Sequence, residues 1–301
     1  MRRILPLFAV LALVAGCGGD DSSSSPGGTL ALDFQPNAVH AGIYQSGLKI
    51  RVPGQSTDSL KLLAAGRADM AVVDIHDLGL ARQAGSDIVG VGALVQRPLA
   101  AVIARRDEVR RPRDLEGKRV GVTGLPSDEA VLRAVVEHDG GDYPRVKKVT
   151  IGFSAVPSLI AGKVDAVVAF WNAEGVTLRS RGVPTREFRV DDYGAPRYPE
   201  LVLAVKRTTL EEHQARVDDM LGAIAEGTDT ALSKRGDTVD KLVRASGADA
   251  PLVRAELAAV APALQPPVEL DRDALEAWAR FDARFGILRP EPDVSQAFYF
   301  R

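Results

Sequence analysis

The chain has 301 residues, of which 46% are hydrophobic and 26% are charged. This is ordinary globular composition, so collagen, coiled coil and overall disorder are excluded. There are 38 lysine and arginine residues against 40 aspartate and glutamate residues, a net charge of −2. Because no basic field is available for a polyanion, we expect no nucleic-acid partner. A single cysteine excludes a disulfide framework, a cysteine-based zinc site and an iron–sulfur cluster.

The first residues indicate export. Arg2 and Arg3 precede an apolar stretch, residues 4–14, which is too short to span a bilayer core of about 30 Å and is typical of a signal peptide. Residues 14–17 read VAGC and resemble the lipobox of bacterial lipoproteins; the alternative is an ordinary signal peptide with a chance cysteine. The resemblance implies a signal peptide over residues 1–16, lipidation of Cys17, and anchorage to the outer face of a bacterial cell membrane. Residues 17–28, rich in glycine, serine and aspartate, are expected to form a flexible tether.

The elements that follow alternate between strand and helix. Apolar runs predict strands over residues 29–34, 48–52, 70–73 and 99–104, with a helix over residues 57–65 that ends at Gly66. A second series has strands over residues 120–123, 149–153, 166–170 and 200–205, with helices over residues 128–138 and 156–161. Helical periodicity then covers residues 210–231, 237–245, 251–260 and 273–285. The fold class is therefore α/β.

The two series contain an internal repeat. Residues 62–73 and residues 158–169 share a helix end, a glycine, a basic residue, an aspartate and an aliphatic strand. Each part has a structural reason, such as a left-handed helix stop for the glycine. The repeat predicts two α/β lobes, residues 29–104 with 204–301 and residues 105–203. Strand-like crossovers near Ala104 and Leu203 would join the lobes around a cleft that closes on a ligand.

Residues 32–44, LDFQPNAVHAGIY, carry a resemblance to a known family. They are similar to the opening motif of the thiamine-pyrimidine-precursor family, ThiY-like substrate-binding proteins of ABC transporters that are related to eukaryotic pyrimidine synthases. Further matches are residues 65–69, 115–121, 171–175 and 285–288. The segment between Tyr44 and Leu48 is shorter than in the family, so we expect a short or irregular first helix.

The resemblance implies a type II periplasmic-binding-protein fold with a small aromatic heterocycle bound between the lobes. Such a ring needs flat apolar faces and a few fixed polar groups at its edge. Candidate faces are Phe34, Tyr44 and Trp171, and candidate edge groups are Asp33, Asn37, His40 and Glu174. Further candidates to line the cleft are His76, Ser127 and Asn172. A carboxylate such as Glu174 pairs well with the amine of an aminopyrimidine.

Each candidate has a structural alternative. Asp33 and Asn37 suit turns, Ser127 suits a helix cap, and His40 suits a buried histidine whose nitrogens are already bonded. Trp171 suits a core position, but it follows a strand, where open α/β sheets bind ligands. Glu174 suits a surface pair, and His76 suits a helix start.

The function expected from the resemblance is that of a solute-binding lipoprotein, not an enzyme, that delivers a hydroxymethylpyrimidine or formylaminomethylpyrimidine type of ligand to an importer. Its partners would be a permease and an ATPase, and we expect a monomer without metal or cofactor. The alternatives are riboflavin or a sulfonate or nitrate type of anion as the ligand. A remote alternative is a synthase-like enzyme. The synthases hold pyridoxal phosphate on a lysine, whereas Val72, Val73 and Asp74 stand where that lysine is expected.

Overall fold

The computed structural model describes residues 27–54 and 58–301. The predicted signal peptide, Cys17 and most of the predicted tether lie outside these residues. The last two tether residues belong to the fold, contrary to expectation, because the Gly27 carbonyl accepts from Arg216 Nε at 3.0 Å and the Gly28 carbonyl accepts from the Lys49 amide at 3.1 Å. Among the described residues, no helix has the length and apolar character needed to cross a membrane.

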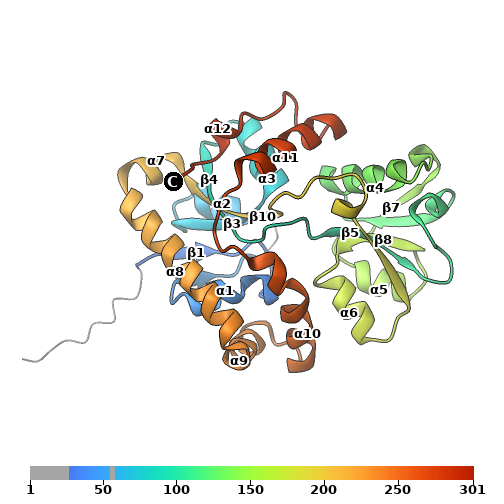
Figure 1. Ribbon diagram of the computed structural model, residues 1–301, viewed down its shortest axis with the longest axis horizontal. Helices are drawn as coiled ribbons and strands as arrows, with labels where there is room; N and C mark the ends of the chain where they lie inside the picture. Colours follow the sequence, from blue (N-terminus) through green and yellow to red (C-terminus); the bar gives the residue numbers. More distant parts are fainter. Residues whose placement is uncertain (1–26, 55–57) are drawn as a thin grey trace, which may run out of the picture.

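Two five-stranded sheets organise the chain (Figure 1). The first has the order β2-β1-β3-β10-β4, and the second has the order β7-β6-β8-β5-β9. The first sheet consists of β1 (Thr29–Ala31), β2 (Lys49–Arg51), β3 (Met70–Asp74), β4 (Ile88–Ala93) and β10 (Leu201–Lys206). The second consists of β5 (Ala100–Arg105), β6 (Arg119–Val122), β7 (Lys147–Thr150), β8 (Ala166–Phe170) and β9 (Thr185–Arg189). In each sheet one strand, β10 or β5, runs antiparallel to both neighbours. The two mixed sheets confirm the α/β class.

Helices cover both sheets, and they gather around the first lobe after β10 (Figure 1). The chain before β10 has α1 (Ala41–Gln45), α2 (Asp58–Ala64), α3 (Ile75–Gln83), α4 (Pro126–His138), α5 (Ala155–Ile160) and α6 (Glu174–Ser180). The chain after β10 has α7 (Arg207–Glu212), α8 (Gln214–Ser233), α9 (Arg235–Ser246), α10 (Ala250–Val260), α11 (Arg272–Phe285) and α12 (Val294–Ala297). Asp271 caps α11 by accepting from two backbone amides, and Gly286 ends it in the left-handed conformation.

The predicted repeat has the same structural role in both lobes. Asp69 accepts from the amide of Thr29, the first residue of β1, at 2.8 Å. Asp165 accepts from the amide of Arg119, the first residue of β6, also at 2.8 Å. Each aspartate therefore fixes the start of the strand that neighbours its own in the sheet. The repeat is structural, as its sequence suggests.

The sheet pairings move both lobe boundaries relative to the prediction. The chain leaves the first sheet after β4 and enters the second at β5, so the first passage is residues 94–99. It returns through residues 190–200, and β10 belongs entirely to the first sheet. The predicted boundaries near Ala104 and Leu203 therefore lie too far along the chain. An apolar run such as residues 99–104 identifies a strand but not the sheet with which it pairs.

Other differences concern elements with weak sequence patterns. Strands β4 and β9 are unpredicted, because β4 contains Gly90 and Gly92 and β9 carries alternating charges at a sheet edge. A Cβ at Gly90 would collide with the Phe298 ring, so this glycine allows the C-terminal segment to pack onto β4. The helix predicted over residues 210–231 is divided at His213 into α7 and α8. The first helix is short, as expected: a single turn over Ala38–His40 followed by α1.

Candidate functional site: an acidic cleft between the lobes

A cleft of about 340 Å³ is lined by residues from both lobes. The first lobe contributes the loop after β1 and the end of β3, and the second contributes the end of β8 and the start of α6. These are the carboxyl ends of parallel strands, where open α/β sheets bind ligands. Of the predicted site residues, those that line the cleft are Asp33, Phe34, Asn37, His76, Ser127, Asn172 and Glu174.

The loop after β1 is held in shape by His40. The His40 side chain is completely buried and does not line the cleft. Its Nδ1 accepts from the Asn37 amide at 3.2 Å, so its Nε2 carries the proton and donates to Asp33 Oδ1 at 2.7 Å. The predicted role of His40 as an edge group is therefore corrected: it positions Asp33. Asn37 caps the following turn by accepting from the Val39 amide, and it also lines the cleft.

Aromatic faces come from both lobes. The Phe34 ring stacks on the Phe153 ring with centroids 5.4 Å apart and an interplanar angle of 30°. This contact joins the first lobe to the second, and Phe153 is 60% exposed. Phe170, at the end of β8, also lines the cleft. Phe153 lies just beyond β7, because the strand predicted over residues 149–153 ends at Thr150.

The structure places Trp171 and Tyr44 outside the cleft lining. Trp171 is 2% exposed, its Nε1 donates to the Pro98 carbonyl at 3.0 Å, and the Arg189 guanidinium lies 4.0 Å from the ring centroid. It therefore fixes the first passage between the lobes. Tyr44 packs partly buried against the hydrophobic core. The prediction that these two rings are ligand faces is corrected accordingly.

The start of α6 places polar groups in the cleft. Glu174 is the first residue of α6, and its carboxylate accepts from the Phe170 amide at 3.1 Å. Burial raises the pKa of Glu174. Asn172 is 2% exposed, and its Oδ1 has no hydrogen-bond partner among the described residues.

Ser127 lies in the first turn of α4 and does not cap it. The N-cap residue is Leu125, which makes no capping bond from its side chain. Asp128 instead accepts from the amide and the hydroxyl of Thr123, which fixes the turn between β6 and α4. The predicted cap is therefore wrong, although Ser127 lines the cleft.

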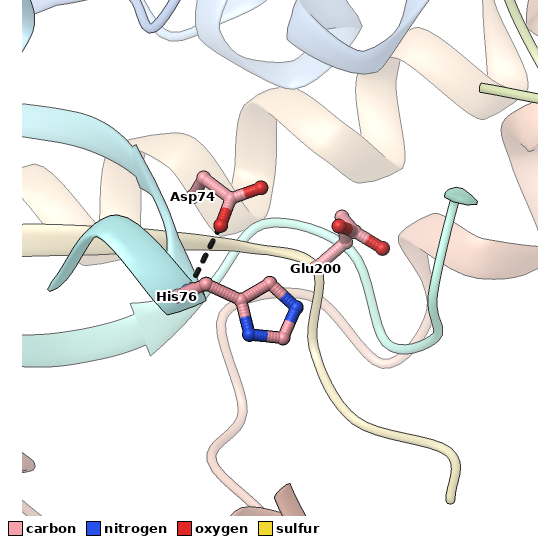
Figure 2. Close-up of side chains that lie close together, drawn as sticks. All are labelled: Asp74, His76 and Glu200. Atoms are coloured by element: carbon pink, nitrogen blue, oxygen red, sulfur yellow. Dashed lines mark hydrogen bonds between the residues drawn. The ribbon is translucent and has the colours of Figure 1, made fainter. Parts of the chain in front are cut away.

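Asp74, His76 and Glu200 all line the cleft, and their side chains form a cluster (Figure 2). Asp74 ends β3 and accepts from the His76 amide at 2.8 Å. His76 Nδ1 lies 2.8 Å from Asp282 Oδ1, and its Nε2 lies 3.2 Å from the Tyr198 hydroxyl. Burial alone would lower the pKa of His76, but the charge of Asp282 and its hydrogen bond raise this pKa to about 10.

Glu200 connects this cluster to the passages between the lobes. Its Oε2 accepts from the Leu99 amide at 2.7 Å, which ties the second passage to the first. Burial, followed by the charge of Asp74, raises the pKa of Glu200 to about 8. Asp74 and Glu200 are not among the site residues predicted from the sequence. The position of Asp74 at the end of a predicted strand was a usable signal, whereas nothing in the sequence pattern singles out Glu200.

The lining is strongly acidic. Its carboxyl side chains are Asp33, Asp74, Asp77, Asp128, Glu174, Glu200 and Glu256. Within the part of the chain that the structure describes, no lysine or arginine lines the cleft, and its basic residue is His76. Burial, followed by the charge of a neighbouring carboxylate, raises the pKa of Asp77 and that of Glu256 to about 7 each. The cleft is therefore suited to ligands that donate hydrogen bonds or carry positive charge.

The residues present do not fit a metal or a lysine-bound cofactor. Asp74, His76 and Glu200 bring three possible ligand atoms within 4.8 Å of one another. However, both nitrogens of His76 are engaged, and a protonated imidazole cannot bind a metal ion. A pyridoxal phosphate aldehyde needs a lysine, and the described lining contains none.

The two mixed sheets and the cleft between them define a type II periplasmic-binding-protein fold. The periplasmic aliphatic sulphonate-binding protein SsuA from Escherichia coli superimposes with a TM-score of 0.74 over 92% of each chain, at 16% identity. The sequence profile of the NMT1/THI5-like family matches residues 41–236, and the chain belongs to this family. The predicted family resemblance is thus confirmed.

Two relatives of the chain carry different functions in their names. A formylaminopyrimidine-binding protein from Halalkalibacterium halodurans is 32% identical over 70% of this chain and 68% of its own length. A 4-amino-5-hydroxymethyl-2-methylpyrimidine phosphate synthase from Legionella pneumophila is 22% identical over 72% of this chain and 73% of its own. The family therefore contains both binding proteins and enzymes.

Proposed function

We propose that the protein is an extracytoplasmic binding lipoprotein of an ABC importer, and that it captures a thiamine pyrimidine precursor of the hydroxymethylpyrimidine or formylaminomethylpyrimidine type. The observation that carries the proposal is the cleft, with carboxyl groups and phenylalanine faces from both lobes and no lysine or arginine in its described lining. The formylaminopyrimidine-binding relative supports the same ligand class.

The chemistry of an aminopyrimidine matches the start of α6. The ring presents an amine donor beside a nitrogen acceptor. A protonated carboxyl group serves both, because its hydroxyl donates to the ring nitrogen while its carbonyl accepts from the amine. The raised pKa of Glu174 favours this protonated form. Phe34, Phe153 and Phe170 supply apolar faces for the ring.

The competing ligands fit this cleft less well. A sulfonate or nitrate needs a cation or several free donors, and the described lining carries an excess of carboxyl groups instead. Riboflavin has a three-ring system, whereas a volume of about 340 Å³ is near the lower end of small-molecule sites, which span roughly 300–1,000 Å³. A synthase-like reaction needs a lysine to hold pyridoxal phosphate, and the described lining contains none.

The proposal is tested by thermal unfolding of the chain from residue 18 onward in the presence of hydroxymethyl- and formylaminomethyl-pyrimidines, thiamine, riboflavin, taurine and nitrate. A ligand at a thousand times its dissociation constant adds about 4 kcal/mol of stability, a shift of about 8 °C or more. We expect this shift with the pyrimidines. Glu174→Gln and Phe34→Ala should remove most of it, whereas Tyr44→Phe, outside the cleft, should retain it. A shift with riboflavin or an anion alone would contradict the pyrimidine assignment.

Anchorage and transport form the second part of the proposal. The lipobox-like residues 14–17 support lipidation of Cys17, so Cys17→Ser should move the protein from the membrane fraction to the soluble fraction.

Ligand contacts from both lobes favour a closed form, which the permease would recognise. Small-angle scattering of the monomer should then show a smaller radius of gyration with ligand; an unchanged radius would contradict lobe closure.

A further inference from the structure

Glu256 is a carboxyl group of the cleft lining. Glu256 lies on α10 and is 8% exposed. Its carboxyl group makes no hydrogen bond or ion pair within residues 27–54 and 58–301. Its electrostatic neighbour is Glu174, which begins α6 in the other lobe. α10 packs against α6, so the two carboxyl groups approach each other from different elements. Two ionised carboxyl groups are unfavourable at such a buried position, so one stays protonated unless a cation binds between them.

Asn172 adds a third acceptor to the lining of the cleft. It lies two residues before Glu174, is 2% exposed, and leaves Oδ1 without a partner among the described residues. A buried polar group without a hydrogen bond costs roughly 1–3 kcal/mol in the empty protein, a cost that a bound donor removes. The basic residue of the lining, His76, is already engaged with Asp282 and Tyr198 and cannot serve here.

We propose that Glu174, Glu256 and Asn172 form a subsite for an organic cation, and that Glu256 makes the cleft prefer a ligand with a protonated amine over its neutral isostere. The subsite takes an ammonium or amidinium group: ionised Glu256 supplies the opposite charge, while the carbonyl oxygen of protonated Glu174 and Asn172 Oδ1 accept from its remaining donors. Applied to pyrimidines this inference rests on the proposed function, but preference for a cation can be measured without a pyrimidine.

The test uses two pairs of ligands that differ mainly in charge. The first is 4-amino-5-aminomethyl-2-methylpyrimidine with its hydroxymethyl counterpart, and the second is benzylammonium with benzyl alcohol. Isothermal titration at pH 7 should show at least a tenfold preference for the cation in each pair, as expected for a hydrogen bond between charged groups. Glu256→Gln should reduce the preference to below about threefold, whereas Glu256→Asp should retain most of it.

The control variant is Glu211→Gln, which makes the same change of charge at an exposed position outside the cleft and should leave the preference intact. The thermal midpoint of each variant without ligand shows whether it is folded. Equal affinity for cation and neutral isostere in the wild-type protein, or a preference that survives Glu256→Gln, would overturn the subsite. If benzylammonium binds through Glu256 and no pyrimidine binds, the subsite stands and the pyrimidine assignment fails. If pyrimidines bind regardless of charge, the pyrimidine assignment stands and the subsite fails. If no ligand binds, the subsite and the pyrimidine assignment are both overturned.

Discussion

The ion pair of His76 and Asp282 joins α3 to α11, and its two side chains are 1% and 0% exposed. Asp282→Asn keeps the size of the side chain and an acceptor for Nδ1, but it leaves a buried imidazolium without its carboxylate. Removing one member of a buried pair costs about 3–5 kcal/mol, and the remaining hydrogen bond places this substitution near the lower limit. We therefore expect the free energy of unfolding at pH 6 to fall by about 3 kcal/mol.

The pH dependence provides a second readout. The pKa of His76 is about 10 in the folded protein and about 6.5 in the unfolded chain. The folded state thus holds this proton more tightly, so the stabilisation is complete below about pH 6.5 and is lost as the pH rises through 10. A shift of this size corresponds to on the order of 5 kcal/mol. The raised pKa values of Asp77 and Glu200 act in the same direction, mainly between about pH 4 and 8.

Guanidinium unfolding followed by circular dichroism at pH 6, 7.5 and 9 measures both effects. The wild-type protein should lose stability steadily over this range, and the Asp282→Asn variant should lose less between pH 7.5 and 9. Glu211→Gln again serves as the exposed carboxyl-to-amide control. A cost below 1 kcal/mol at pH 6, together with an unchanged pH dependence, would show that His76 is neutral in the folded protein and would refute the reasoning.

The remaining predictions concern packing. Gly227→Ala on α8 should lower the free energy of unfolding, measured in urea, by about 2 kcal/mol or more, because the new Cβ would overlap the Gly42 carbonyl of α1. Gly222→Ala on the same helix meets open space, so it should leave the free energy of unfolding unchanged or raise it by up to about 1 kcal/mol. Equal effects at the two glycines would contradict this account of the helix contact. Trp171→Phe should lower the free energy of unfolding by about 1–2 kcal/mol, because the hydrogen bond to the Pro98 carbonyl is lost. It should change ligand affinity by less than about threefold. A large loss of affinity without loss of stability would instead place Trp171 in the binding site.

The elements that the sequence predicts well are those whose cause is local. Gly66 and Gly162 end their helices in the left-handed conformation, and the aspartates that follow them start their strands, so the repeat could be predicted without knowing the fold. The loop after β1 is similar: Asp33, Phe34 and Asn37 line the cleft as expected, because they directly follow a strand of the sheet.

The parts that could not be predicted depend on contacts between distant segments. Trp171 follows a strand end just as Asn172 and Glu174 do, but the passage of residues 94–99 covers it. Glu256 enters the cleft because α10 packs against α6, a contact that no local pattern indicates. His40 lies in the same motif as Asp33, and only its burial shows that it acts through that carboxylate.

Strand β10 has a consequence for how the protein is made. All five strands of the second sheet come from one continuous stretch, residues 100–189, so this lobe can fold as soon as that stretch is available. The first sheet stays divided, because β10 must insert between β3 and β4. When the chain folds from its N-terminal end, residues 29–93 therefore leave one edge of β3 and one edge of β4 without the strand that joins them, until residues 201–206 are available. The first lobe, although it begins the chain, is the last to complete its sheet, and unpaired strand edges are the sites at which a partly folded chain aggregates.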